Sequence, residues 1–486
     1  MVELWSAENK IILERELWVA VLQSQKQLGQ QIPDGVVEDY KKVINQVDLD
    51  SINDRERIVK HDVKARIEEF CALAGHEHIH KGMTSRDLTE NIEQLQIRQS
   101  LELICHQAAA ALHLLSHNAR TYAETAVTGR THNVAAQVTT LGKRFATAAE
   151  EMLHAFTNLE QTLSNYPLRG IKGPVGTQQD LVDLLGGQEQ AEQLEKQIRE
   201  YLGFNQTLES VGQVYPRSLD FNVVSSLVQL SSAPANLAKT LRLMAGHDLV
   251  TEGFQEGQVG SSAMPHKMNM RSCERISGLS HVLQGHLTMV TSLLGDQWNE
   301  GDVSCSVVRR IALPDAFLAI DGLLQTFLSV LEDFGAYPKV IERELKHYLP
   351  FLSTTRILTA ATQAGLGREE AHEAIKAHAI SAALDLRDND GGENTLLQRI
   401  AEDQNIPLTY DELKNAIASP EIGRTDEQIQ AVDRNIQAVL EKYPESRSYT
   451  PETISSSIWV ASSNCKTQAG FALTMFYMLL HTVFQL

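Results

Sequence analysis

Residues 260–269 (GSSAMPHKMN) bring together side chains that can carry acid–base chemistry on an anionic substrate. A glycine precedes two adjacent serines, and Lys267 follows Ser261 six positions later. Backbone N–H groups in such a turn form a nest for negative charge, and the helix expected just after it adds positive potential. Ser261 would be held there as an alkoxide, and Lys267 would supply charge to a carboxylate. The segment predicts a catalytic loop, with a Ser/Pro-rich helix cap as the alternative.

Residues 82–91 (GMTSRDLTEN) form a second candidate site at the start of an expected helix. Thr84 and Ser85 stand where the helix would begin, and Asp87 and Glu90 follow in its first turn, as in a capping box. The hydroxyls can simply cap the helix, but beside exposed N–H groups they can also bind a carboxylate. These residues alone leave both interpretations open.

Two histidines have neighbours that suit acid–base work. His132 follows Thr131 and is expected directly before an apolar-periodic helix. A single histidine is more often structural than catalytic, so its weight depends on the other motifs. His61 stands beside Asp62, and an adjacent carboxylate can hold an imidazole charged or fix its tautomer.

Two further stretches offer polar side chains near prolines or in one helical turn. Residues 212–222 (GQVYPRSLDFN) place Gln213 and Arg217 around a proline turn. Ser306 and Arg310 are four apart on one expected helical face, a spacing suited to phosphate.

Histidine clusters that could bind a metal occur twice. His76, His78 and His80 alternate as they would in a strand, while His113 and His117 have helical spacing. Neither set brings a carboxylate or thiolate in a familiar ligand spacing. No metal site is predicted.

The elements that must position these residues are helices. No proline occurs between Pro33 and Pro167, and apolar residues recur there at three- and four-residue spacing. The pattern predicts an all-α fold with a bundle of long helices. We expect an N-terminal helical domain over 1–90, a central bundle over 91–345 and a C-terminal helical domain over 346–486.

The composition limits the possible partners. The chain has 486 residues, is 43% hydrophobic and carries a net charge of −19, which argues against nucleic acid or an anionic membrane surface. An anionic substrate would need a local positive pocket. The five cysteines are scattered and no signal-peptide pattern opens the chain, so a cytoplasmic location is expected. The apolar segment 470–486 is at the short limit for a membrane span, and a buried or oligomer-facing helix is favoured over a tail anchor.

Together the motifs resemble the fumarase/aspartase superfamily, whose signature is a Gly-Ser-Ser-x-Met-Pro-x-Lys-x-Asn loop. Three further motifs occur in the superfamily's order: HKGMTS at 80–85, the pair Thr131–His132, and the turn at 213–220. The resemblance explains why motifs so far apart in the chain share one chemistry.

Within the superfamily the chain is most similar to the adenylosuccinate lyase family. The similarity lies in HDV at 61–63, His266 before the lysine, YPRSLD, and the pair Ser306 and Arg310. Residues from about 446 to 486 fall outside it.

The resemblance implies a lyase that releases fumarate by β-elimination in purine nucleotide biosynthesis. Such an enzyme cleaves adenylosuccinate to AMP and fumarate, and the succinyl-aminoimidazole-carboxamide ribotide to its carboxamide and fumarate. It implies a homotetramer with each site built from three subunits, an anionic nucleotide substrate, and no metal or organic cofactor. Neither nucleic acid nor a membrane is an expected partner.

The resemblance also implies roles for individual residues. Ser261 would be the base, His132 the acid that protonates the leaving nitrogen, and Lys267 a carboxylate ligand. His61 completes the catalytic set. The implied substrate-binding residues are Lys60, Asp62, His80, Thr84, Ser85, Asp87, Thr131, Gln213, Arg217, Ser262, Met264, Asn269, Ser306 and Arg310.

Three departures from the family pattern affect the expected nucleotide end. Met270 stands where proline usually follows Asn269, and Gly301 stands where an arginine is frequent. Many members begin with an Arg-Tyr pair that contacts the nucleotide, and this chain starts at about the following residue. The cations expected to compensate are Lys60, Arg217, Arg309 and Arg310.

Two other functions stay open at this level. Argininosuccinate lyase, or another fumarate-releasing lyase, keeps the chemistry with a different leaving group, but His266 and YPRSLD argue against it. A helical homo-oligomer that has lost catalysis is the second, and the intact Ser261, His132 and Lys267 argue against that.

Overall fold

The structure is a computed structural model that describes residues 1–253, 261, 263–389, 392–420 and 422–452. Helices dominate it, as predicted, and the strands of the described residues form only two short antiparallel pairs. The elements are α1 (Ala7–Gln27), α2 (Val36–Val43), α3 (Leu49–Val59), α4 (Asp62–Ala74), α5 (Ser85–Thr121), β1 (Ala126–Thr131), β2 (Val134–Thr140), α6 (Leu141–Ser164), α7 (Gln179–Leu185), α8 (Gln188–Tyr201), α9 (Ser218–Ala245), β3 (Val250–Thr251), α10 (Arg271–Thr291), α11 (Ser304–Asp333), β4 (Gly335–Ala336), α12 (Pro338–Leu352), α13 (Thr354–Gln363), α14 (Arg368–Asp388), α15 (Leu396–Glu402), α16 (Tyr410–Ile417), α17 (Thr425–Lys442) and the 3₁₀ turn Pro444–Ser448.

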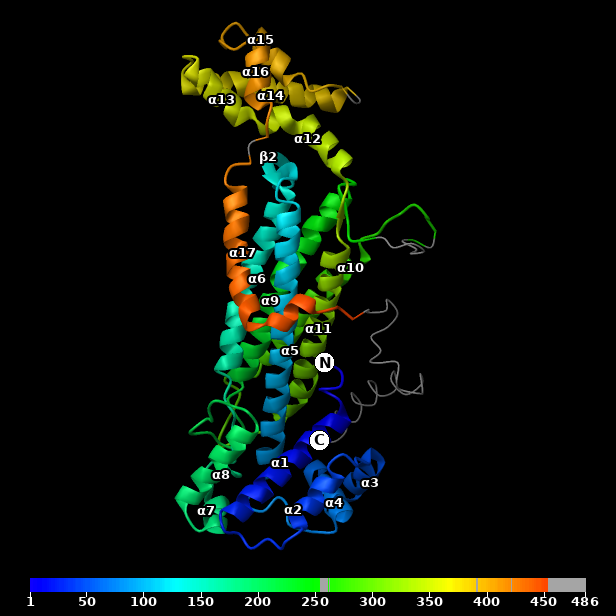
Figure 1. Ribbon diagram of the computed structural model, residues 1–486, viewed down its shortest axis with the longest axis vertical. Helices are drawn as coiled ribbons and strands as arrows, with labels where there is room; N and C mark the ends of the chain where they lie inside the picture. Colours follow the sequence, from blue (N-terminus) through cyan, green and yellow to red (C-terminus); the bar gives the residue numbers. More distant parts are fainter. Residues whose placement is uncertain (254–260, 262, 390–391, 421, 453–486) are drawn as a thin grey trace.

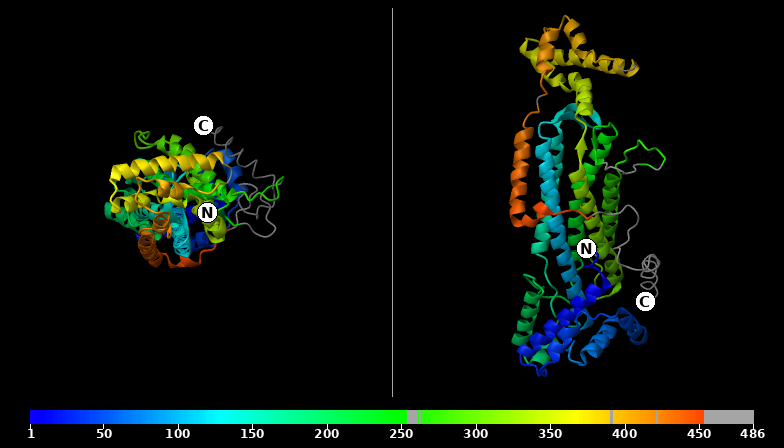
Figure 2. Two further views of the ribbon diagram at one scale, coloured as in Figure 1. Left: turned by 90° about the horizontal axis from the view of Figure 1, so that it is seen from above. Right: turned by 45° about the vertical axis from the view of Figure 1, so that its right-hand side comes forward.

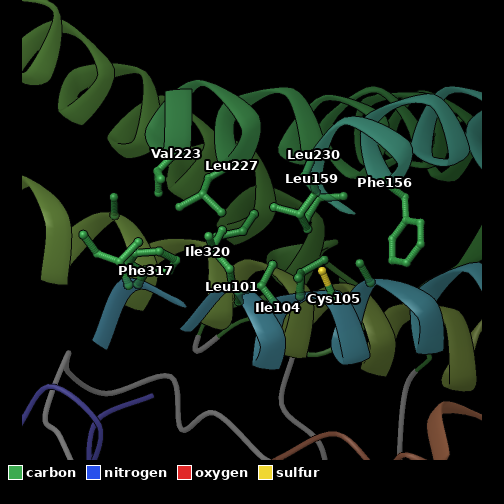
Figure 3. Packing of buried hydrophobic residues seen from close by; sticks show 14 of the residues in the cluster. Leu101, Ile104, Cys105, Phe156, Leu159, Val223, Leu227, Leu230, Phe317 and Ile320 are labelled. Carbon is green, nitrogen blue, oxygen red and sulfur yellow. The ribbon is translucent and has the colours of Figure 1, made fainter. Parts of the chain in front are cut away.

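Five long helices, α5, α6, α9, α10 and α11, form the central bundle (Figure 1). α5 packs on α6 and α11, and α9 packs on α6, α10 and α11. Their facing sides interdigitate, as Leu101, Phe156, Leu227 and Phe317 from four different helices show (Figure 3). Each of these side chains is at most 1% exposed, so the apolar spacing of the sequence corresponds to a continuous core.

α11 is the one described helix that is long and apolar enough to cross a membrane by composition. Its most apolar window has a mean hydropathy of 1.4 and is 67% buried inside the protein. Burial against α5, α9 and α10 accounts for that composition, because a core helix is apolar on every face.

The bundle separates two groups of shorter elements (Figures 1 and 2). The N-terminal helices α1–α4, with α7 and α8, lie at one end. The β1–β2 hairpin and helices α12–α16 lie at the other, where α12 contacts both strands. Residues between Leu349 and Ile417 have their own apolar core.

After α16 the chain leaves the far end and runs back along the bundle. α17 returns to the bundle and packs along α5 and α6, so the segment 346–486 contains both a separate small core and a helix of the bundle surface. The division at 90 and 345 stays a prediction, and the apolar segment 470–486 lies outside the described residues.

One local prediction was wrong. The sequence placed His132 directly before a helix, but β2 separates it from α6, which begins at Leu141. Thr131 pairs with Val134, so His132 and Asn133 form a two-residue hairpin turn with φ of 52° and 61°. Positive φ at both positions is the geometry of a tight hairpin, and the β-branched residues that follow favour a strand.

Candidate active site

The start of α5 gathers many of the candidate residues at the lower end of the bundle in Figure 1. Thr84 is the N-cap and its N–H donates to Asp87 Oδ2 at 2.8 Å, so the predicted capping box is present. Ser85 is the first helical residue and is half-buried. We call the group built around this point the α5-start cluster; it consists of Lys60, His61, Asp62, His80, Thr84, Ser85, Arg86, Gln213, Ser306 and Arg310.

α11, which is distant from α5 in the sequence, contacts the start of α5 there and also approaches α4. Ser306, in the first turn of α11 and 8% exposed, accepts a hydrogen bond from Arg86 Nη2 at 2.9 Å. Arg310, one turn later, lies 4.0 Å from Asp62 and is largely exposed. The predicted Ser306–Arg310 face therefore points at α5 and α4 together.

The histidine before α4 caps that helix. His61 is its N-cap, and Nδ1 accepts from the N–H of Lys64 at 3.4 Å. The adjacent Asp62 lies 3.5 Å from the same nitrogen. Lys60, in the left-handed conformation with φ of 56°, ends α3 and is exposed.

His80 is held in one tautomer by a tryptophan. Trp18 Nε1 lies 3.0 Å from His80 Nδ1, and an indole N–H can only donate. Nδ1 must therefore be the acceptor, which leaves the proton on Nε2. Burial lowers the pKa of His80 to about 4, although the Asp87 carboxylate opposes that shift. His80 is thus a neutral hydrogen-bond donor near pH 7.

Asp87 and Arg217 lie behind this surface rather than on it. Asp87 is fully buried and pairs with Arg169 at 2.7 Å, besides accepting from the N–H groups of Lys172 and Gly173. Arg217 is 3% exposed and pairs with Glu90 at 3.0 Å. Asp87 therefore holds the backbone at 172–173, and Arg217 holds the Glu90 side chain. We correct their expected role: in this structure the two residues position neighbouring residues of the site and do not contact substrate.

Arg309, one of the expected compensating cations, is also enclosed. Its guanidinium contacts Asp220 and Glu93, each at 2.7 Å. It is 2% exposed. The expectation that Arg309 or Arg217 reaches a phosphate is not supported, because protein carboxylates already engage both.

Gln213 lies against the position that carries glycine instead of the family's arginine. Its N–H donates to the carbonyl of Glu300 at 2.6 Å. A Cβ added to Gly301 would come within 2.8 Å of Gln213 Cβ. The two segments therefore pack too closely for a side chain at 301 without a local shift.

The signature loop cradles its serine hydroxyl with backbone donors. Ser261 Oγ accepts from the N–H of Met264 at 3.1 Å and of Ala263 at 3.4 Å. Lys267 N–H donates to the carbonyl of Met264 at 3.0 Å, which closes the turn. Two N–H groups aimed at one oxygen favour its negative charge, and the same two contacts also occur in a helix cap, so the catalytic role of Ser261 stays a prediction.

The remaining loop candidates differ in how far the structure describes them. Met264 is 44% exposed and Lys267 is exposed, while Asn269 is half-buried. Ser262 lies outside the described residues. The positive potential expected from the following helix is not free, because the N–H groups of Ser272 and Cys273 at the start of α10 donate to Glu252.

The β1–β2 hairpin, whose turn contains His132, lies at the opposite end of the bundle from the start of α5 (Figure 1). α5 has 37 residues, so about 55 Å separates its two ends at about 1.5 Å per residue. The hairpin with Thr131 and His132 follows the far end, and both side chains are exposed. One subunit cannot bring His132 and Ser85 to one substrate.

The histidines that could have bound a metal are not gathered in a metal site. Among the described residues, no group of three or more His, Cys, Asp and Glu side chains is arranged to hold a metal ion. His76 instead pairs with Asp39 at 3.0 Å, in a segment that is not a strand.

Three residues that contribute to the candidate site were not predicted from the sequence: Arg86, Trp18 and Glu252. Each acts through a partner 20 to 220 positions away. The position of Arg86 directly after Ser85 was the only signal in the sequence that could have pointed to it.

Comparisons with known proteins agree with this arrangement. A family model described as lyase matches residues 5–285, and one described as adenylosuccinate lyase C-terminus matches 350–432. The adenylosuccinate lyase of Saccharomyces cerevisiae is 33% identical over 449 residues, which cover 90% of this chain and 92% of that protein. This chain belongs to the adenylosuccinate lyase family. That of Schizosaccharomyces pombe is 32% identical over 448 residues, covering 90% and 93% of the two chains.

Two solved structures share the fold of this chain. The 3-carboxy-cis,cis-muconate lactonizing enzyme from Pseudomonas putida superimposes with a TM-score of 0.77 at 17% identity, covering 90% of this chain and 96% of that one. A fumarate lyase from Mesorhizobium sp. BNC1 gives 0.73 at 20% identity, with the same coverage. As an adenylosuccinate lyase family member, the chain is a lyase with the fumarase/aspartase fold.

Proposed function

We propose that this protein cleaves adenylosuccinate to AMP and fumarate, and the succinyl-aminoimidazole-carboxamide ribotide to its carboxamide and fumarate. The observation that carries the proposal is the Ser261 hydroxyl, cradled by two backbone N–H groups in the family's signature loop. A cradle of this kind supports a serine acting as a base, which an ordinary serine cannot do.

The reaction begins at the carbon next to a succinyl carboxylate. Ser261 takes its proton, and the electron pair left behind is delocalised into that carboxylate as a dianion. Lys267 and Asn269 supply positive charge and a hydrogen bond to it. Electrostatic stabilisation of this kind is effective where the charge develops.

The carbon–nitrogen bond then breaks and fumarate forms. The electron pair of that bond stays on the leaving nitrogen, which receives a proton from His132. His61 lies with the α5-start cluster and assists His132 across the subunit boundary. Thr84 and Ser85 bind a succinyl carboxylate with their hydroxyls and the first N–H groups of α5.

A homotetramer with shared sites follows from the same proposal. The length of α5 supports it, because the hairpin of one subunit must meet the α5-start cluster of another. Oligomers of this kind form closed symmetric assemblies. We also propose a cytoplasmic location and a nucleotide substrate whose phosphate is held near Ser306 and Arg310.

A substrate panel tests the function directly. The purified protein is incubated with adenylosuccinate, the imidazole-carboxamide analogue and argininosuccinate, and fumarate is followed by its ultraviolet absorbance. We expect release from the two purine substrates only. Release from argininosuccinate alone would assign another lyase, and release from none would favour a homo-oligomer without this catalysis.

A further inference from the structure

The cation missing at Gly301 has a candidate replacement on α5. Arg86 follows Ser85 directly, and its guanidinium contacts two side chains in the described part of the chain. Nη2 donates to Ser306 Oγ at 2.9 Å, and Nη1 lies 3.4 Å from Glu90. A guanidinium has five N–H donors, so these contacts leave donors for a third partner.

The contact also fixes how Ser306 can bind a ligand. Because Ser306 Oγ accepts from Arg86, its own proton is directed elsewhere and can be donated. A hydroxyl that accepts from a guanidinium and donates to an anion is suited to a phosphate oxygen. Arg86 thus orients the hydroxyl and adds charge beside it.

The charge on Arg86 is not matched by the carboxylates around it. Glu90 is shared with Arg217 at 3.0 Å and with Arg309 at 3.6 Å. The connected network contains four cations and three carboxylates, a net charge of +1. Its members are Lys10, Arg86, Arg217 and Arg309 with Glu90, Glu93 and Asp220.

Two cations of the network are accessible to solvent, Lys10 with a side chain 26% exposed and Arg86, and of these two it is Arg86 that hydrogen-bonds Ser306. Arg217 and Arg309 are each 2% exposed at the side chain, whereas Arg86 is 12% exposed. Arg86 is therefore the cation of the network that a ligand at Ser306 can reach. Arg310 follows Ser306 by one turn of α11, and its guanidinium lies 4.0 Å from Asp62.

We propose that Arg86 is a phosphate-binding residue of this site, which takes the place of the arginine absent at Gly301 and orients Ser306. The inference rests on the proposed function, since it assumes that a nucleoside monophosphate lies at the α5-start cluster. None of the sequence motifs assigned a role to Arg86, and its partner Ser306 lies on α11.

The experiment compares binding of AMP and adenosine by titration calorimetry. These ligands differ only in the phosphate, so their ratio isolates it. The proteins are the wild type, Arg86→Ala, Arg86→Lys, and Arg368→Ala as control. Arg368 is exposed on α14 and pairs with its neighbour Glu369, so its removal changes the net charge equally without touching the site.

We expect Arg86→Ala to weaken AMP about 10- to 100-fold, the range for a charged hydrogen bond, with adenosine unchanged. The AMP affinity of Arg86→Lys should lie between those of the wild type and Arg86→Ala, because an ammonium keeps the charge but cannot contact Ser306 and a phosphate in one plane. Glu90 keeps two cations in both variants, so the fold should persist, as thermal unfolding will show.

Three outcomes would overturn the inference. They are unchanged AMP affinity in Arg86→Ala, an equal loss for adenosine, or the same loss in Arg368→Ala. If Arg86→Ala does not fold, the ratio of AMP affinity to adenosine affinity is measured for Arg86→Lys instead, and an unchanged ratio overturns the inference. Failure of the proposed function would look different: the wild type would release no fumarate from adenylosuccinate and would not prefer AMP to adenosine.

Discussion

Mixing two inactive variants should restore activity if the sites are shared between subunits. His61 caps α4 and precedes Asp62, which lies 4.0 Å from Arg310 of α11. His132 lies in the hairpin beyond the far end of α5. The 37 residues of α5 span about 55 Å, whereas a histidine side chain reaches only a few ångströms. The two imidazoles of one chain cannot meet in one site.

The size of the effect follows from counting. In an equal mixture of His61→Ala and His132→Ala chains, a site is intact only when each histidine comes from the other variant. Each condition is met in half of the cases when subunits exchange at random, so about a quarter of the sites should work in a closed symmetric assembly. Fumarate release should rise toward about a quarter of the wild-type rate.

The matched control uses two residues of one loop. Ser261→Ala and Lys267→Ala both lie in the same turn, closed by the hydrogen bond from Lys267 N–H to Met264. Every site takes that loop from a single chain, so mixing these variants should restore nothing. Subunit exchange is verified by mass spectrometry of differently tagged chains. No recovery in the first mixture after verified exchange, or recovery in the control, would refute shared sites.

Further predictions concern single residues. Ser261→Ala and His132→Ala should each lower kcat about 10²- to 10⁴-fold while substrate binding survives, and near-normal turnover would remove either from its role. Arg310→Ala should raise KM by about one to two orders of magnitude and lower kcat less, because a charged hydrogen bond to a remote phosphate is lost; steady-state kinetics check this. The fluorescence of Trp18 is obtained as the wild-type signal minus that of Trp18→Phe. It should not change from pH 7.5 to 5.5, because a protonated imidazole would quench the indole and the pKa of His80 is lowered to about 4. A quenching step near pH 6.5, the usual range of histidine, would show that His80 titrates freely.

The sequence predicted the helical bundle because its signal is periodic and local. Apolar residues of α5 and α11 recur at helical spacing over whole turns, and the structure buries them in one core. The β1–β2 hairpin escaped prediction for the opposite reason. Its strands have only six and seven residues, and β2 runs directly into α6, so the short alternation of β2 merges with the helical pattern that follows.

The candidate site was predicted in its linear parts only. The turn around Ser261 is built by donors two and three residues away, so its cradle is visible in the sequence. The partners of Ser306 and His80 are not, since Arg86 and Trp18 lie 220 and 62 positions distant. Burial of Asp87 and Arg217 also depends on long-range packing, which motif spacing does not contain.

Three of the seven non-glycine residues with positive φ in the described part of the chain are candidate site residues. Positive φ is uncommon outside glycine, yet Lys60, His80 and His132 all have it, at 56°, 65° and 52°. Each stands in a connection between regular elements, and such conformations persist only where the surroundings hold them. Lys60 connects α3 to α4, His80 lies between α4 and α5, and His132 is in the turn of the β1–β2 hairpin, which packs against α12. The bundle therefore separates two sets of candidate residues, one at the start of α5 and one at the β1–β2 hairpin beyond its far end. This separation is what the proposal of sites shared between subunits is meant to explain.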